Sequence, residues 1–252
     1  MKQLTLQPIA LGQAETADWI IWDQLAQLAR KLDPRDWVLV GGQMVALHSH
    51  IAGVLPMRTS RDIDLVANVI ARPGVLARLS NVMTEVGLVP QPSADDRRLH
   101  RFVGDGLVVD IMIPDHLPRH LLPRLVGRNP VAIAGGQRAL IRAATADIVT
   151  ASGTSTIPVP DLIGALVLKA RASIVDRRDG GRHLLDLAHL SALVDDPIEL
   201  RTQLDAKELR SLRKVTLTTS AVLDPWIRLE PTLRDRAIEA WRTLIGDAPP
   251  SP

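Results

Sequence analysis

The stretch from Val38 to Val66 constrains the fold more than any other part of the chain. It begins with three aliphatic residues, passes through Gly41-Gly42 into a segment rich in apolar residues, and ends at Asp62-Ile63-Asp64-Leu65-Val66. Because successive side chains on a strand point to opposite faces, we expect Asp62 and Asp64 to project together, about 7 Å apart at Cα. The stretch therefore predicts a strand, a helix and a second strand. Its two carboxylates suit a hard divalent cation such as Mg²⁺.

Composition indicates a folded protein that does not span a membrane. Apolar residues make up 46% of the 252 residues, and no apolar run is long enough to cross a bilayer. The N-terminus lacks a signal-peptide core and the chain has no cysteine, which excludes disulfides and thiolate metal sites and predicts a cytoplasmic location. Charge is almost balanced, with 30 basic and 28 acidic residues, and aromatic content is only 2%. Few aromatic side chains argue against a stacking platform for single-stranded nucleic acid.

The pattern of apolar residues and turn signals divides the chain into two halves. Strands and helices are mixed in the first half, whereas only helical periods follow the proline-rich segment Thr156–Asp161. We expect an α/β (α+β) protein, with a mixed β-sheet domain over residues 1–155 and a helical domain over residues 156–252. The expected helices are 16–32, 44–50, 73–87, 161–175, 182–194, 207–221 and 231–245, and the expected strands are 37–40, 62–66, 99–103, 107–113 and 131–133.

Three charged residues lie in segments that are otherwise apolar. Asp110 interrupts the strand Leu107–Ile113, where an uncompensated carboxylate is costly; it either shares a metal with Asp62 and Asp64 or pairs with an arginine. Lys169 ends an apolar helical run, where it either holds a triphosphate or extends its ammonium to solvent. Asp186 lies among leucines, and its alternative role is a structural pair with Lys169 or Arg182.

Gly41 and Gly42 allow two interpretations. They permit a ligand to approach the backbone at the start of a helix, where amides bind phosphate, or they form a tight strand-to-helix turn. The chain contains neither G-x-x-x-x-G-K-[ST] nor G-x-G-x-x-G, so the common nucleotide-binding loops are absent. His48 and His50 are two residues apart on a predicted helix and do not share a face as a zinc pair would.

The ordered motifs G-G-x-x-x-A-L, R-x-[ST]-x-D-x-D-L, an isolated strand aspartate and K…R…D-L resemble the AbiEii-type nucleotidyltransferase toxins, including the MenT-like group. This family belongs to the DNA polymerase-β-like nucleotidyltransferase superfamily. The resemblance covers roughly Val38 to Leu190. It implies a nucleotidyltransferase-like N-terminal domain that holds metal and NTP, followed by a helical domain that contributes Lys169 and Asp186.

The resemblance also implies roles for individual residues. Nucleotide phosphates would be bound by Gly41, Gly42, Gln43, Arg58, Ser60 and Lys169, and Mg²⁺ or Mn²⁺ by Asp62, Asp64 and Asp110. Asp110 would complete the metal site or take a proton from the acceptor hydroxyl. The catalytic set would be Asp62, Asp64, Asp110, Lys169 and Asp186. Gln43 stands where many members have Ser or Thr, and Arg182-His183-Leu184-Leu185-Asp186 replaces the family's K-D-x-x-D.

The implied activity is transfer of a nucleoside monophosphate from an NTP to RNA, for example the 3′ end of tRNA, with release of pyrophosphate. The implied partner is an antitoxin protein. Two alternatives come from different classes: a nucleotidyltransferase that modifies a protein or small-molecule hydroxyl, and a catalytically silent module that binds a nucleotide or partner. Gln43 and Arg182-His183 are the features that suggest the silent module. A structural α/β protein with an incidental D-x-D is a further alternative.

Overall fold

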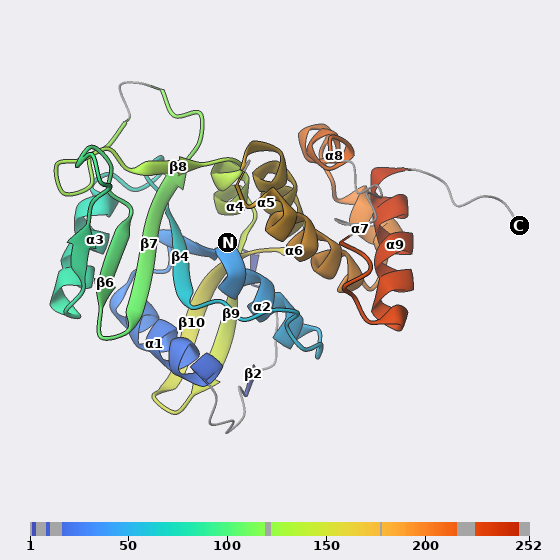
Figure 1. Ribbon diagram of the computed structural model, residues 1–252, viewed down its shortest axis with the longest axis horizontal. Coiled ribbons are helices and arrows are strands. Elements are labelled where there is room, and N and C mark those ends of the chain that lie inside the picture. The colour runs from blue at the N-terminus through green and yellow to red at the C-terminus, as the bar shows by residue number, and fades with distance from the viewer. Residues whose placement is uncertain are drawn as a thin grey trace, which may run out of the picture. The chain divides into compact units, whose positions relative to one another are not determined.

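A computed structural model describes residues 2–3, 9–10, 17–118, 122–176, 178–215 and 225–246 (Figure 1). The chain forms two compact units. The first consists of Met1–Met44 and Arg58–Asp161, and the second of Val45–Met57 and Leu162–Pro252. Within the described ranges, no helix combines the length and apolar character that crossing a membrane requires.

A mixed sheet of six strands forms the centre of the first unit. Its order is β3 (Trp37–Val40), β4 (Asp62–Ala67), β7 (Leu107–Pro114), β6 (Arg101–Gly104) and β5 (Val89–Gln91), and β8 (Val131–Ile133) also pairs with β7. Strand β4 runs parallel to β7, whereas β3 is antiparallel to β4 and β6 to β7. Figure 1 shows β4, β7 and β6 next to one another. Strand β6 pairs with the first half of β7 and β8 with its end, so β7 is the central strand around which the sheet is arranged.

A second sheet completes the first unit. Strands β9 (Ala143–Thr150) and β10 (Gly153–Pro160) form an antiparallel hairpin, and the short β1 (Lys2–Gln3) and β2 (Ile9–Ala10) both pair with β9. The predicted domain boundary between residues 155 and 156 falls inside β10, because Thr156–Pro160 pairs with Ala143–Asp147. The two units instead change over between Asp161 and Leu162. The sequence prediction missed this hairpin because its prolines lie on a strand with a free edge, where proline is tolerated.

Four helices begin in the first unit: α1 (Ala17–Lys31), α2 (Gly41–Ile51), α3 (Val75–Glu85) and the short α4 (Gly136–Ile141). The first three agree with the predicted helices to within a few residues, and α4 was not predicted. Helix α2 starts at the glycines themselves rather than after them, and its residues from Val45 onward belong to the second unit. Position 16 of the predicted first helix lies outside the described residues.

The described part of the second unit contains, besides the C-terminal part of α2, the helices α5 (Leu162–Val175), α6 (Gly180–Ala192), α7 (Pro197–Thr202), α8 (Ala206–Arg213) and α9 (Pro231–Ile245). Helix α5 packs on α6 and α8, and α9 packs on α6 and α7. The short α7 was not predicted, and residues 216–221 of the predicted helix 207–221 lie outside the described residues. The predicted fold class, a mixed α/β N-terminal part with a helical C-terminal part, is confirmed.

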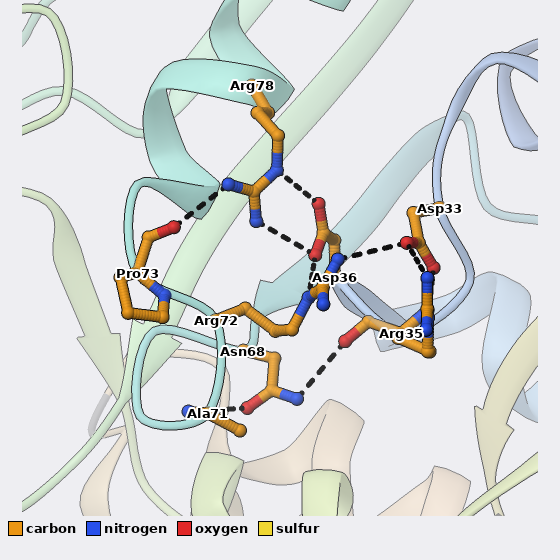
Figure 2. A network of polar contacts seen from close by, with 8 residues as sticks. All are labelled: Asp33, Arg35, Asp36, Asn68, Ala71, Arg72, Pro73 and Arg78. Carbon is orange, nitrogen blue, oxygen red and sulfur yellow. Dashed lines mark hydrogen bonds and ion pairs between the residues drawn. The ribbon is translucent and has the colours of Figure 1, made fainter.

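A buried carboxylate ties the start of β3 to α3 and to the loop before that helix (Figure 2). Asp36 is 2% exposed and forms ion pairs with Arg72 (Nε–Oδ1, 2.6 Å) and Arg78 (Nε–Oδ2, 2.7 Å). Arg72 also reaches Asp33. Burial opposes ionisation of Asp36, but the hydrogen bonds from Arg78 and Arg72 outweigh it and lower the pKa of the carboxyl. This network fixes the N-terminal end of the strand that leads to the glycine turn.

Candidate active site

Alternation along β4 and β7 separates an apolar face of the sheet from a polar one. Ile63, Leu65, Val109 and Ile111 are fully buried and lie on one face. Asp62, Asp64 and Asp110 occupy the alternate positions and therefore share the other face, as the period of two predicts for Asp62 and Asp64. Asp64 lies in register with Asp110 on the neighbouring parallel strand. The sheet thus assembles the three predicted carboxylates, although Asp110 lies more than forty residues after the other two.

Arg101 extends the same row onto β6. It lies opposite Asp110 in the antiparallel pair, so Asp64, Asp110 and Arg101 occupy adjacent positions on three neighbouring strands. Its guanidinium donates to both oxygens of Asp110, with Nε–Oδ1 at 2.9 Å and Nη2–Oδ2 at 2.8 Å. Nη2 also lies 3.5 Å from Oδ2 of Asp62. The pKa of Arg101 is raised by the hydrogen bond to Asp110 and by the charges of Asp110, Asp62 and Asp64. Asp110 therefore has the arginine partner that the sequence left open as an alternative.

The glycine turn lies directly against this carboxylate group. Gly41 has φ +68°, and a Cβ added there would be 1.8 Å from Oδ2 of Asp64. A Cβ added at Gly42 would be 2.6 Å from both Cβ and Oγ of Ser60 and 3.2 Å from Nη1 of Arg58. Both glycines are therefore required by close approach, and Gly41 also by its backbone conformation. The glycines form the predicted tight turn, which places the start of α2 beside Asp64 and Ser60. Approach of a ligand to this backbone stays a prediction.

Gln43 is buried, and its side-chain amide contacts the protein backbone. Nε2 donates to the backbone carbonyl of Ser60 at 2.7 Å, and the residue is 2% exposed. This contact joins the first turn of α2 to the segment that precedes β4 and makes Gln43 a positioning residue for Ser60. Direct contact between Gln43 and nucleotide phosphate stays a prediction.

The second unit brings Lys169 and Asp186 together. Lys169 on α5 and Asp186 on α6 form an ion pair with Nζ–Oδ2 at 2.7 Å, and their side chains are 3% and 2% exposed. The structural pairing that the sequence left open for Asp186 is thus present. Next to it, His183 contacts Asp176 through Nε2 at 3.3 Å. Burial and then the charge of Lys169 lower the pKa of His183.

The donor atoms at Asp62 and Asp64 fit a magnesium ion. Carboxylate oxygens are the ligands that Mg²⁺ prefers, and it is usually bound by one or two carboxylates with water and substrate phosphates supplying the rest. Among the described residues, no group of three His, Cys, Asp or Glu side chains is arranged to hold a metal ion. The bidentate contact of Arg101 with Asp110 gives the physical reason, because the third carboxylate is already paired with a cation. Coordination of a metal ion by Asp110 together with Asp62 and Asp64 stays a prediction.

The prediction of site residues missed Arg101, although the chain contains a signal for it. Asp105-Gly106 is a two-residue turn of the type that fixes hairpin register. With Gly104 opposite Leu107, the register places Arg101 opposite Asp110. An arginine directly across from the one charged residue of an apolar strand is the expected partner of that residue.

Comparison with known proteins identifies the family. The family model described as "Nucleotidyl transferase AbiEii toxin, Type IV TA system" matches residues 23–251. The chain belongs to the AbiEii family. It is therefore a nucleotidyltransferase, the toxin of a type IV toxin–antitoxin system. A crystal structure of an antigenic nucleotidyltransferase-like protein from Paracoccidioides brasiliensis is similar, with a TM-score of 0.49 and 16% identity over 79% of this chain and 88% of that chain. Among curated proteins, none matches the chain.

Proposed function

We propose that this AbiEii protein transfers a nucleoside monophosphate from an NTP to an RNA acceptor, at the 3′ end of tRNA, with release of pyrophosphate. In this proposal Asp62 and Asp64 hold Mg²⁺ or Mn²⁺ beside the glycine turn. A divalent cation held there would supply positive charge that stabilises the α-phosphate and the leaving pyrophosphate. Arg58, Ser60 and the backbone at Gly41-Gly42 bind the phosphates.

One observation carries the proposal: Asp62 and Asp64 share one face of a sheet, and the carboxylate of Asp64 lies against the glycine start of a helix. This combination supplies what a nucleoside triphosphate needs, namely hard oxygen ligands for its metal and backbone amides for its phosphates. The first turn of α2 contains no acidic residue. The positive end of the helix dipole therefore favours an anion at this terminus. Ser60 and Arg58 lie against Gly42, and this proximity supports their assignment to the same phosphates.

The helical unit supplies the remaining proposed groups. We assign Lys169 to neutralisation of phosphate charge and Asp186 to its orientation, because Asp186 holds the ammonium of Lys169 at 2.7 Å. The first unit is the proposed nucleotidyltransferase domain, in place of residues 1–155, and the second unit is the proposed helical domain, in place of residues 156–252. The proposed cellular setting is the cytoplasm, where the partner would be the cognate antitoxin that the family implies.

Incubation with each labelled NTP, Mg²⁺ and total RNA tests the proposal. The wild-type protein is expected to label RNA, and Asp62→Ala is expected to reduce labelling by at least about 10³-fold, since it removes a metal ligand on which charge stabilisation depends. Lys169→Met is expected to lower labelling as well. Asp235→Ala is the matched control, because Asp235 is exposed on α9 in the second unit.

The labelled species separates the possible acceptors. Label on protein or on a small molecule, with none on RNA, would keep nucleotide transfer as the reaction but show that the acceptor is not RNA. Full labelling by Asp62→Ala would contradict the assignment of the metal site.

A further inference from the structure

The row formed by Arg101, Asp110 and Asp64 includes one positively charged group, the guanidinium of Arg101. Arg101 is held at one end by the register of the β6–β7 hairpin, which sets it opposite Asp110. At the other end, its guanidinium uses two donors on the two oxygens of Asp110. A planar fork bound to both oxygens of a carboxylate is the strongest geometry available to an arginine. Asp110 is 6% exposed, so its carboxylate is largely withdrawn from water, whereas the side chain of Arg101 is 37% exposed.

The contact of Arg101 with Asp62 differs from its contact with Asp110. A single nitrogen, Nη2, lies 3.5 Å from Oδ2 of Asp62, at the outer limit of a hydrogen bond. The side chain of Asp62 is 42% exposed, against 9% for Asp110. Asp62 can therefore exchange this weak contact for a metal ion at little cost, whereas Asp110 would have to give up a bidentate pair in which its own carboxylate is buried.

The charges in the group support the same division. With all groups ionised, Asp62, Asp64 and Asp110 together with Arg101 carry a net charge that equals in size that of one divalent cation. His100 is the other basic group near Asp110, with Nε2 at 4.0 Å from Oδ2. Without Arg101, three carboxylates on neighbouring strands would repel one another and attract metal more strongly.

We propose that Arg101 is the resident counter-ion of the carboxylate site, which holds Asp110 out of metal coordination and leaves Asp62 and Asp64 as the ligands of one divalent cation. The inference rests on the proposed metal site and adds a positioning residue to it. Asp110 then acts by fixing Arg101 rather than by binding the metal. Arg101 lowers the affinity for metal alone and limits the site to a single cation.

Titration with Mn²⁺ alone, followed by electron paramagnetic resonance of the free ion, tests this role without nucleotide or activity. Arg101→Gln is expected to bind Mn²⁺ about tenfold or more tightly than wild type, because it removes a positive charge a few ångströms from the ligands. The same variant is expected to melt at lower temperature without metal and to recover with Mn²⁺. Arg128→Gln, which removes a guanidinium paired with the exposed Asp96 outside the site, is the matched control and should bind Mn²⁺ like wild type.

Two combined variants locate the effect. Arg101→Gln with Asp110→Asn is expected to return to wild-type affinity, since counter-ion and partner are removed together. Arg101→Gln with Asp64→Asn is expected to lose the gained affinity. Binding by Arg101→Gln no tighter than by wild type would overturn the proposal, and so would a double variant with Asp110→Asn that binds many-fold more weakly than wild type, because Asp110 would then be a ligand.

These outcomes are distinct from failure of the proposed function. If Asp62→Ala transferred nucleotide normally, the catalytic assignment would fall. If Arg101→Gln failed to bind Mn²⁺ more tightly while Asp62→Ala abolished transfer, only the counter-ion role would fall.

Discussion

At Gly41 a single hydrogen in place of a side chain decides where the carboxylate of Asp64 can lie. A Cβ at that position would overlap Oδ2 of Asp64, and the positive φ adds strain for any other residue. Gly53 has nearly the same φ, +66°, but a Cβ there would meet nothing within 4 Å. The pair of glycines therefore separates the effect of backbone strain from the effect of close approach.

Gly41→Ala is expected to lower nucleotide transfer by about 10²-fold, because displacement of a ligand by about 1 Å is enough for a loss of that size. Gly53→Ala is expected to cost about 1 kcal/mol of stability through its left-handed backbone and to keep transfer unchanged. Labelling rates and thermal unfolding of both variants provide the measurement. Equal activities would show that the approach to Asp64 is not needed for catalysis.

At the scale of elements, the Asp36 network joins β3 to α3 and to the loop that precedes it. Asp36→Asn removes the charge that both arginines share and is expected to lower the free energy of unfolding by about 2 kcal/mol. Urea denaturation measures the loss. Asp96→Asn is the comparison, because Asp96 pairs with Arg128 but its side chain is 69% exposed, and it should cost less than about 1 kcal/mol. A similar loss in both variants would mean that burial of Asp36 adds nothing.

Some of the helices and strands could be predicted from the sequence and others could not. The strand–turn–helix from Trp37, the D-x-D strand and the hairpin around Asp105-Gly106 were predicted because period-two alternation, glycines and turn residues act locally. The β9–β10 hairpin was missed because its prolines resemble a linker. Strand β9 pairs with β1 and β2, which lie more than 130 residues away, and no local sequence pattern predicts such a long-range contact.

For the molecule as a whole, the buried histidine His189 makes stability depend on pH. His189 is 1% exposed, and its Nε2 lies 2.7 Å from Oγ of Ser49, which donates its own proton to the carbonyl of Val45. With the Ser49 hydroxyl donating to Val45, Nε2 is the donor of this contact. Among the described residues, Nδ1 has no hydrogen-bond partner. Burial lowers the pKa of His189, although Asp186 opposes the shift. Protonation would bury a charge and an unpaired N–H together.

Because the folded pKa of His189 is below the unfolded value of about 6.5, the unfolded state binds the additional proton first as pH falls. Stability is therefore expected to be full above about pH 6.5 and to decrease below it, by about 1 kcal/mol at pH 5.5 from this residue. Thermal unfolding at pH 7.5 and 5.5 measures the difference. His189→Gln is expected to be less stable at both pH values but to lose less between them; an unchanged pH dependence would exclude His189 as the source.

The sequence by itself determined the local elements, the shared face of Asp62 and Asp64, and the family. Strand periodicity, the conformational freedom of glycine and the family motifs each depend on residues that are close together in the sequence. Tertiary structure decided which charges meet. The sheet order placed Asp110 between Asp64 and Arg101, where it forms the arginine pair that was one of the two roles open to it. Helix packing in the second unit likewise paired Lys169 with Asp186. A buried charge takes whichever partner the packed chain brings within hydrogen-bond distance, and only the folded structure sets that distance.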